Sequence, residues 1–162
     1  LRQNSPPSSW RWVKLAGSWF GGLLNTTAVF GLPGVQSVFV IYGITFFLLV
    51  LLGSFVMADA IADYIRRKNP ETVSLVAMGW GGRVKSPEDE SLAEYIEKRL
   101  SGQEPDFASM KQRIRMHPQG AKFFDPRQPE FVEGDFHCAM DLNRFGFCLR
   151  VVPGEPPRVE KA

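Results

Sequence analysis

Charged side chains are absent from residues 15–58, which contain no Asp, Glu, Lys, Arg or His. Within this stretch, residues 35–58 are almost wholly apolar and exceed the roughly 20 residues that a membrane-spanning helix needs. The same stretch is rich in Phe, Val and Ile, which also favour buried strands. The pattern therefore leaves two interpretations open, a membrane span and part of a buried sheet.

Several motifs are missing, and each absence narrows the function. The chain has two cysteines, Cys138 and Cys148, without a CxxC spacing, so we expect reduced thiols in the core of a cytoplasmic protein. No GxSxG element supports a Ser-His-Asp arrangement. The net charge of +2 gives no reason to expect a nucleic-acid partner, because such binding needs basic residues gathered on one face.

From Asp59 onward the sequence has the pattern of an α/β protein. An apolar stripe at helical spacing covers residues 58–65 and ends at Asn69-Pro70, and residues 72–78 form a short β-rich run. Further predicted elements are helices over 87–100 and 106–116 and a final strand over 145–152, whereas residues 131–141 are ambiguous. This order predicts an α/β fold with a mixed sheet and helices packed on its faces.

The best candidate site is the segment 79–90, between the predicted strand and the following helix. Ligands of open α/β sheets gather beyond the carboxyl ends of strands. Gly81 and Gly82 allow backbone N–H groups to approach an anion, and Arg83 can form a bidentate clamp on phosphate or sulfonate. The alternative is a plain loop whose acids only complement the helix dipole.

The start of that helix carries several agreeing signals. Ser86 is a good N-cap, and Pro87 suits the first helical position. Ser86 and Asp89 fit the broad capping-box pattern. Glu88, Asp89 and Glu90 also provide hard oxygen ligands of the kind that Mg²⁺ prefers.

Four groups of motifs follow one another between residues 54 and 152. They are Ser54-Phe55-Val56 with Ala58-Asp59-Ala60-Ile61-Ala62, Ser86-Pro87-Glu88-Asp89-Glu90, His117-Pro118-Gln119-Gly120-Ala121-Lys122, and Asp135 to Asp141 with Arg144-Phe145-Gly146-Phe147. Together they resemble the 2-phosphosulfolactate phosphatase family. The segment at 117–122 is similar to the family's "small residue, Pro, x, Gly, x, Lys/Arg" pattern. No one piece is decisive, but their order together is fairly specific.

The resemblance implies a Mg²⁺-dependent hydrolysis of 2-phospho-3-sulfolactate to 3-sulfolactate and phosphate, of the coenzyme M biosynthesis type. It implies that Glu88 or Asp89 orients the attacking water or holds the metal, with Asp89 and Glu90 as metal ligands. Gly81, Gly82 and Arg83 would bind the substrate. Further substrate-binding candidates are Asn4 and Ser5, from a Gly-Asn-Ser-Pro element, and Thr26 and Thr27, from a Thr-Thr-Asn-Gly-Thr loop.

The chain also departs from the family pattern. Family members carry about half a domain upstream, and Met57 stands where they have Asn after Ser-Phe-Val. We therefore expect an irregular segment over 1–34, an incomplete C-terminal portion of a larger α/β phosphatase domain over 35–152, and a Pro-rich tail over 153–162. Such a fragment could be inactive.

Three organisations follow from these observations. The first is a cytoplasmic phosphatase portion that can assemble with copies of itself as a homo-oligomer. The second is a membrane-anchored protein, with residues 35–58 as the span and an α/β domain that binds a ligand or partner. The third is a noncatalytic subunit that needs another chain to complete its sheet. The resemblance begins inside the apolar run, which favours the first.

Overall fold

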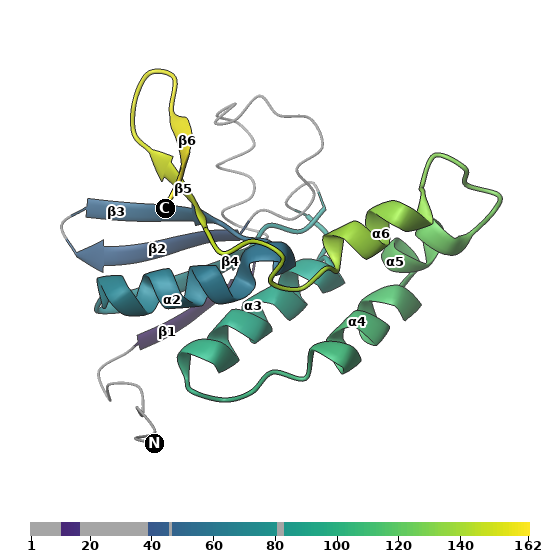
Figure 1. The fold of residues 1–162 in the computed structure, drawn as a ribbon, viewed down its shortest axis with the longest axis horizontal. Helices are drawn as coiled ribbons and strands as arrows, with labels where there is room; N and C mark the ends of the chain where they lie inside the picture. The colour runs from purple at the N-terminus through teal and green to yellow at the C-terminus, as the bar shows by residue number, and fades with distance from the viewer. Residues whose placement is uncertain (1–10, 17–38, 46, 81–82) are drawn as a thin grey trace.

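A six-stranded mixed sheet with helices packed against it forms the protein (Figure 1). The structure is a computed structural model that describes residues 11–16, 39–45, 47–80 and 83–162. The strand order is β1-β4-β2-β3-β5-β6, in which β1 pairs with β4 in parallel and all other neighbours are antiparallel. The strands are β1 (Arg11–Ala16), β2 (Phe39–Thr45), β3 (Phe47–Leu52), β4 (Thr72–Ala77), β5 (Leu149–Val152) and β6 (Arg158–Lys161). The α/β class with a mixed sheet is confirmed.

The apolar run contributes strands to this sheet. β2 and β3 pair antiparallel with each other, and β2 also pairs with β4. A membrane helix over residues 35–58 is therefore wrong for the described part of that range, where the dense β-branched and aromatic residues favour strands. Within the described ranges, no helix combines the length and apolarity needed to cross a membrane.

The helices follow the predicted periodicity closely. A short 3₁₀ turn η1 (Phe55–Met57) leads into α2 (Ala58–Lys68), which ends at Asn69 in the left-handed conformation with φ 45°. α3 (Pro87–Leu100) is followed by Gly102 at φ 74°, a left-handed conformation that glycine commonly adopts just past a helix end. Lys and Arg side chains near the carboxyl ends of both helices complement the helix dipole.

The third predicted helix is also present, and shorter helices follow it. α4 (Phe107–Met116) has Asp106 as its N-cap, whose carboxylate accepts a hydrogen bond from the N–H of Ser109. The remaining helical elements are α5 (Pro118–Ala121), η2 (Lys122–Phe124) and α6 (Glu133–Ala139). α6 resolves the ambiguity over residues 131–141 in favour of a helix.

The C-terminal part of the chain differs from the prediction. The strand expected over 145–152 is confined to β5. Residues 145–147 lie outside the sheet, and Cys148 exchanges backbone hydrogen bonds with Ala162 just beyond the paired strands. Residues 158–161, inside the segment expected as a tail, form β6 and pair with β5 along its whole length. Alternation of polar and apolar residues is too short here to show a strand, so pairing with β5 decided it.

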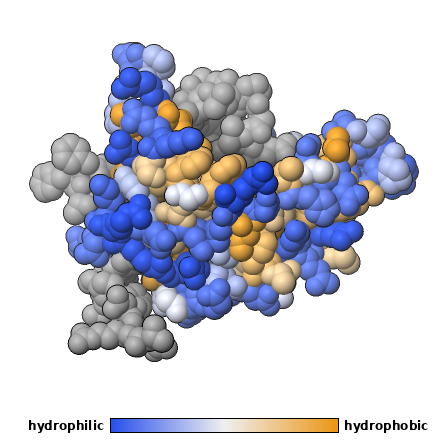
Figure 2. All heavy atoms as spheres, in the orientation of Figure 1, coloured by the Kyte–Doolittle hydropathy of each residue, from blue (hydrophilic) through white to orange (hydrophobic). Residues whose placement is uncertain are grey.

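The core lies between the sheet and the helices. α2 and α3 lie side by side along one face of the sheet in Figure 1, and Val73, Leu75 and Ala77 of β4 are buried in the same cluster as residues from both helices. From the helices the cluster includes Ala58, Ile61, Ala62, Ile65, Leu92, Ile96, Leu100, Met110 and Ile114. The outer surface of these helices is mostly hydrophilic, with apolar surface showing between the polar side chains (Figure 2).

Candidate functional site

The loop that follows β4 turns sharply at a glycine. Gly79 has φ 66°, a left-handed conformation that side chains disfavour. A Cβ at this position would lie 2.2 Å from the carbonyl oxygen of Val84, so the backbone on the far side of the loop passes too close for any other residue. Trp80 closes the turn by donating its N–H to the same oxygen at 2.7 Å.

Asp89 joins the two ends of this segment. Its Oδ2 accepts a hydrogen bond from the N–H of Gly79 at 2.7 Å, which connects the first turn of α3 to the end of β4. The predicted capping box is therefore wrong, because the Asp89 carboxylate bonds to Gly79 and Ser86 makes no side-chain capping bond. Because the fold brings the end of β4 close to α3, the N–H of Gly79 replaces the backbone N–H at the helix start as the donor to Asp89.

The Asp89 carboxyl is fully buried, at 0% exposure. Its pKa is raised to about 7, mainly by desolvation and also by the negative charges of Glu88 and Glu90, against the opposing effect of the hydrogen bond from Gly79. Its Oδ1 is also buried and has no hydrogen-bond partner in the described part of the chain. A buried carboxyl oxygen of this kind accommodates either a proton or a cation.

Lys122 reaches the same loop from a distant part of the sequence. Its ammonium lies 5.1 Å from the centre of the Trp80 ring. Gly120 allows this approach, because a Cβ there would lie 2.1 Å from the carbonyl oxygen of Ile114 and would push the segment away from the end of α4. Lys122 belongs to the family-like segment 117–122, but no local pattern in the sequence marks it as a site residue.

Some of the predicted site residues lie in the described part of the chain, and the others lie outside it. Arg83 is exposed at the loop, and Glu88 and Glu90 are partly exposed at the start of α3, on either side of the buried Asp89. The predicted substrate-binding residues Asn4, Ser5, Thr26, Thr27, Gly81 and Gly82 lie outside the described residues. Sequence reasoning also missed Trp80, whose side chain is 53% exposed beside Lys122.

The carboxylates of the loop fit Mg²⁺ only in part. Across residues 11–16, 39–45, 47–80 and 83–162, no three His, Cys, Asp or Glu side chains are grouped as a metal site would require. Mg²⁺ commonly uses one or two protein carboxylates together with water and substrate phosphate. The unpartnered Oδ1 of Asp89 fits that mode of binding, and the remaining ligands would have to come from water and substrate.

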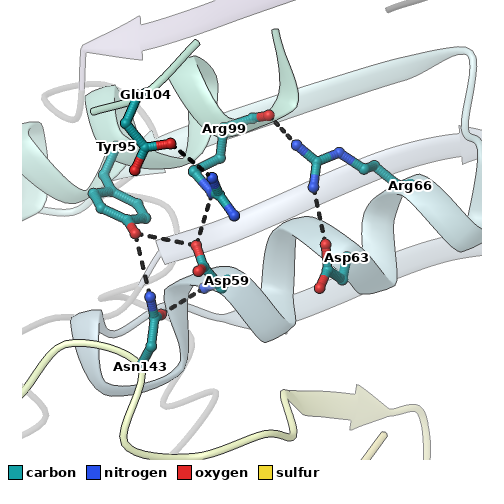
Figure 3. A network of polar contacts seen from close by, with 7 residues as sticks. All are labelled: Asp59, Asp63, Arg66, Tyr95, Arg99, Glu104 and Asn143. Atoms are coloured by element: carbon teal, nitrogen blue, oxygen red, sulfur yellow. Dashed lines mark hydrogen bonds and ion pairs between the residues drawn. The ribbon is translucent and has the colours of Figure 1, made fainter. Parts of the chain in front are cut away.

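A second polar cluster lies at the start of α2 (Figure 3). Asp59 Oδ1 accepts a hydrogen bond from the Tyr95 hydroxyl at 3.1 Å and lies 2.9 Å from Arg99 Nε, an ion pair. Asn143 donates to the Tyr95 hydroxyl at 3.2 Å, and its Oδ1 accepts from the N–H of Asp59 at 2.8 Å. Asn143 is itself in the left-handed conformation, with φ 58°, which Asn tolerates better than most residues.

This cluster fastens the C-terminal segment to the helical layer. The N–H of Asn143 donates to the carbonyl of Phe55, and the N–H of Phe145 donates to that of Val56. A cavity of about 210 Å³ lies beside it, lined in part by Asp59, Asp63 and Asn143. The charges of Asp59 and Asp63 are balanced by Arg99 and Arg66, so the cluster has the character of a structural network.

Comparison with known proteins distinguishes the loop after β4 from the cluster around Asp59 and Asn143. Residues 47–123 match the family model of 2-phosphosulpholactate phosphatase. The match spans slightly less than half of the chain and confirms the central part of the resemblance to this phosphatase family. No curated protein and no solved structure matches significantly.

The phosphatase-matching segment runs from β3 into η2. It contains the entire loop between β4 and α3, together with Asp89 and Lys122, whereas Asn143 lies beyond it. Met57 occupies the place of an Asn expected from the resemblance and is buried in the core at 7% exposure, so it offers no polar group there. The loop after β4 is therefore the better candidate for the active site.

Proposed function

We propose that the loop between β4 and α3 is the active site of a phosphoric monoester hydrolase that acts on 2-phospho-3-sulfolactate. Water would be added across the phosphate ester bond, and 3-sulfolactate and phosphate would be released, a reaction of the coenzyme M biosynthesis type. The observation that carries the proposal is that the family-matching segment includes both the loop and Lys122, whose ammonium lies 5.1 Å from the Trp80 ring.

The charges around the loop suit an anionic substrate. Arg83 lies in the loop that leads into α3, and the ammonium of Lys122 lies beside Trp80 of the same loop. The amino end of α3, where this loop ends, also favours negative charge. A guanidinium binds two phosphate oxygens at once, so Arg83 would hold and orient the phosphoryl group. Backbone N–H groups at Gly81 and Gly82 would stabilise an anionic oxygen in the same way.

Asp89 changes its charge near neutral pH. A pKa of about 7 means that both its acid and its carboxylate forms are populated there, and the carboxylate form is the one that can hold a cation. Its buried position makes contact with bulk water poor, whereas Glu88 in the preceding position is partly exposed. We therefore assign orientation of the attacking water to Glu88 and control of the loop to Asp89.

Magnesium is part of the proposal. Asp89, through Oδ1, and Glu90 would hold the ion. When bound, Mg²⁺ would neutralise negative charge on the phosphoryl group. The chain's own residues would fix the loop that surrounds it, through the bond from Gly79 to Asp89.

A cytoplasmic location also belongs to the proposal. It is supported by the two cysteines, which are not bonded to each other: Cys148 is buried and Cys138 is exposed on α6. The prediction of two core thiols is wrong for Cys138, because α6 turns that side chain outward. An exposed free thiol is typical of a reducing compartment.

The direct test is phosphate release by the purified full chain from 2-phospho-3-sulfolactate, measured with MgCl₂ and with EDTA. We expect Mg²⁺-dependent release that falls at least about tenfold in Arg83→Gln, because a charged contact to phosphate is lost. Arg158→Gln on the exposed strand β6 is the matched control and should keep the wild-type rate. Absence of release by the wild-type chain with Mg²⁺ would contradict the proposal.

A further inference from the structure

Lys122 occupies an unusual environment for a surface cation. Its ammonium lies 4.0 Å from the centre of the Phe131 ring, 5.1 Å from that of Trp80 and 5.4 Å from that of Phe123. These rings come from the loop after β4, from η2 and from the segment before α6. Attraction between the ammonium and the faces of the rings therefore fixes the position of Lys122 from several directions.

No carboxylate neutralises this ammonium within the described part of the chain. The faces of aromatic rings attract a cation, but they accept hydrogen bonds from its N–H groups more weakly than an anion does. The partly buried side chain is therefore poised to bind an anion beside Trp80. Lys98 illustrates the contrast, because its ammonium is 2.7 Å from the carboxylate of Glu94.

The cation is also placed beside the reaction site without being part of the loop itself. Trp80 immediately follows Gly79, whose N–H is hydrogen-bonded to Asp89. The ammonium of Lys122 contacts the proposed site through the side chain of Trp80. A substrate with its phosphate at the loop would extend its other end toward this ammonium. An anionic group at that end would gain a charged hydrogen bond that a neutral group lacks.

We propose that Lys122 binds the carboxylate or sulfonate of a phosphate ester that carries such a group in addition to its phosphate, and that it sets the preference of the site for such substrates over simple phosphate monoesters. This inference rests on the proposed phosphatase function. Trp80 and Phe131 hold the ammonium and exclude water from its sides, and Lys122 is a binding residue. The contact contributes to recognition of the substrate at a distance from the phosphoryl group.

The test compares wild type with Lys122→Met, which keeps the length and apolar stem, Lys122→Arg, which keeps the charge, and Lys111→Met on α4 as a control. The measured quantity is the ratio of kcat/KM for 2-phospho-3-sulfolactate to that for phenyl phosphate. We expect Lys122→Met to lower this ratio at least about tenfold, and Lys122→Arg to retain most of it. A ratio unchanged in Lys122→Met would overturn the inference.

Calorimetric binding of 3-sulfolactate separates this inference from the proposed function. Binding by wild type that Lys122→Met weakens about tenfold supports the role of Lys122, even if no ester is hydrolysed and the phosphatase proposal fails. Hydrolysis with an unchanged ratio supports the phosphatase and overturns the role of Lys122. Neither binding nor hydrolysis by wild type overturns both.

Discussion

Asn143 and Asp59 are bonded across 84 residues of sequence, the side-chain oxygen of Asn143 accepting the backbone N–H of Asp59 at 2.8 Å. The amide nitrogen of the same Asn143 donates to the Tyr95 hydroxyl at 3.2 Å. One side chain thereby joins the start of α2, the middle of α3 and the segment that leads to β5 (Figure 3). This junction closes the helical layer over the sheet.

Replacing Asn143 should destabilise the fold in two separable ways. Asn143→Gly loses both side-chain bonds but tolerates the φ of 58°, and we expect a loss of about 1–3 kcal/mol in the free energy of unfolding. Asn143→Ala should lose roughly 1 kcal/mol more, because Ala disfavours the left-handed conformation. Urea denaturation measures both values. Equal stability of the two variants would contradict the expected cost of placing Ala in the left-handed conformation.

The contact between Asn143 and Tyr95 is testable by a double-mutant cycle. Tyr95→Phe removes the hydroxyl that links Asp59 to Asn143 but keeps the ring that packs on Phe55 and Phe107. We expect a coupling energy of roughly 0.5–3 kcal/mol between Tyr95→Phe and Asn143→Gly. Strictly additive effects in urea denaturation would show that the two side chains act independently.

Asp89 should make stability depend on pH in a specific direction. Its pKa is raised from 3.8 unfolded to about 7 folded, so the folded state binds the proton more tightly. Its contribution to stability is complete below about pH 4 and is lost as pH rises through 7, an effect on the order of 4 kcal/mol for full ionisation.

Asp89→Asn isolates this effect from other titrating groups. The free energy of unfolding of the variant minus that of wild type should increase between about pH 4 and pH 8, since Asn carries no charge to bury. Phosphatase activity should fall well over tenfold in the same variant, because Asn supplies no carboxylate. A difference in stability that stays constant with pH would show that Asp89 does not titrate in this range.

Gly79→Ala should disrupt the loop. The added Cβ would lie 2.2 Å from the carbonyl oxygen of Val84 at a φ of 66°, so we expect a loss of about 2 kcal/mol or more in stability, together with lower activity. Gly134→Ala in α6 is the matched control, because its Cβ would meet only Val132 Cγ1 at 3.8 Å. That variant should be neutral or slightly stabilised in a thermal melt.

Magnesium binding has a readout that does not depend on turnover. An ion that binds only the folded chain raises the melting temperature with its concentration. We expect such an increase for wild type and none for Asp89→Asn at pH 8, measured by calorimetry. An identical response of both proteins would remove Asp89 from the ion's ligands.

The sequence by itself determined the local elements after residue 54. Apolar spacing predicted α2, α3 and α4, and the Pro, Gly and charged residues at their ends predicted where they begin and stop, because these signals act within one or two helical turns. The β-rich composition of the apolar run left strand and membrane helix open, and only pairing of β2 with β4 decided it.

Tertiary structure alone decided the partners of the polar side chains. Asp89 had the local signature of a capping box, but its carboxylate accepts a hydrogen bond from the N–H of Gly79 at the strand end instead. Lys122 had no local signal that would place it beside Trp80, and Asn143 none that would place it beside Asp59. A hydrogen bond or a cation–ring contact depends on distances between segments far apart in the chain, and these distances exist only once the helices have packed on the sheet.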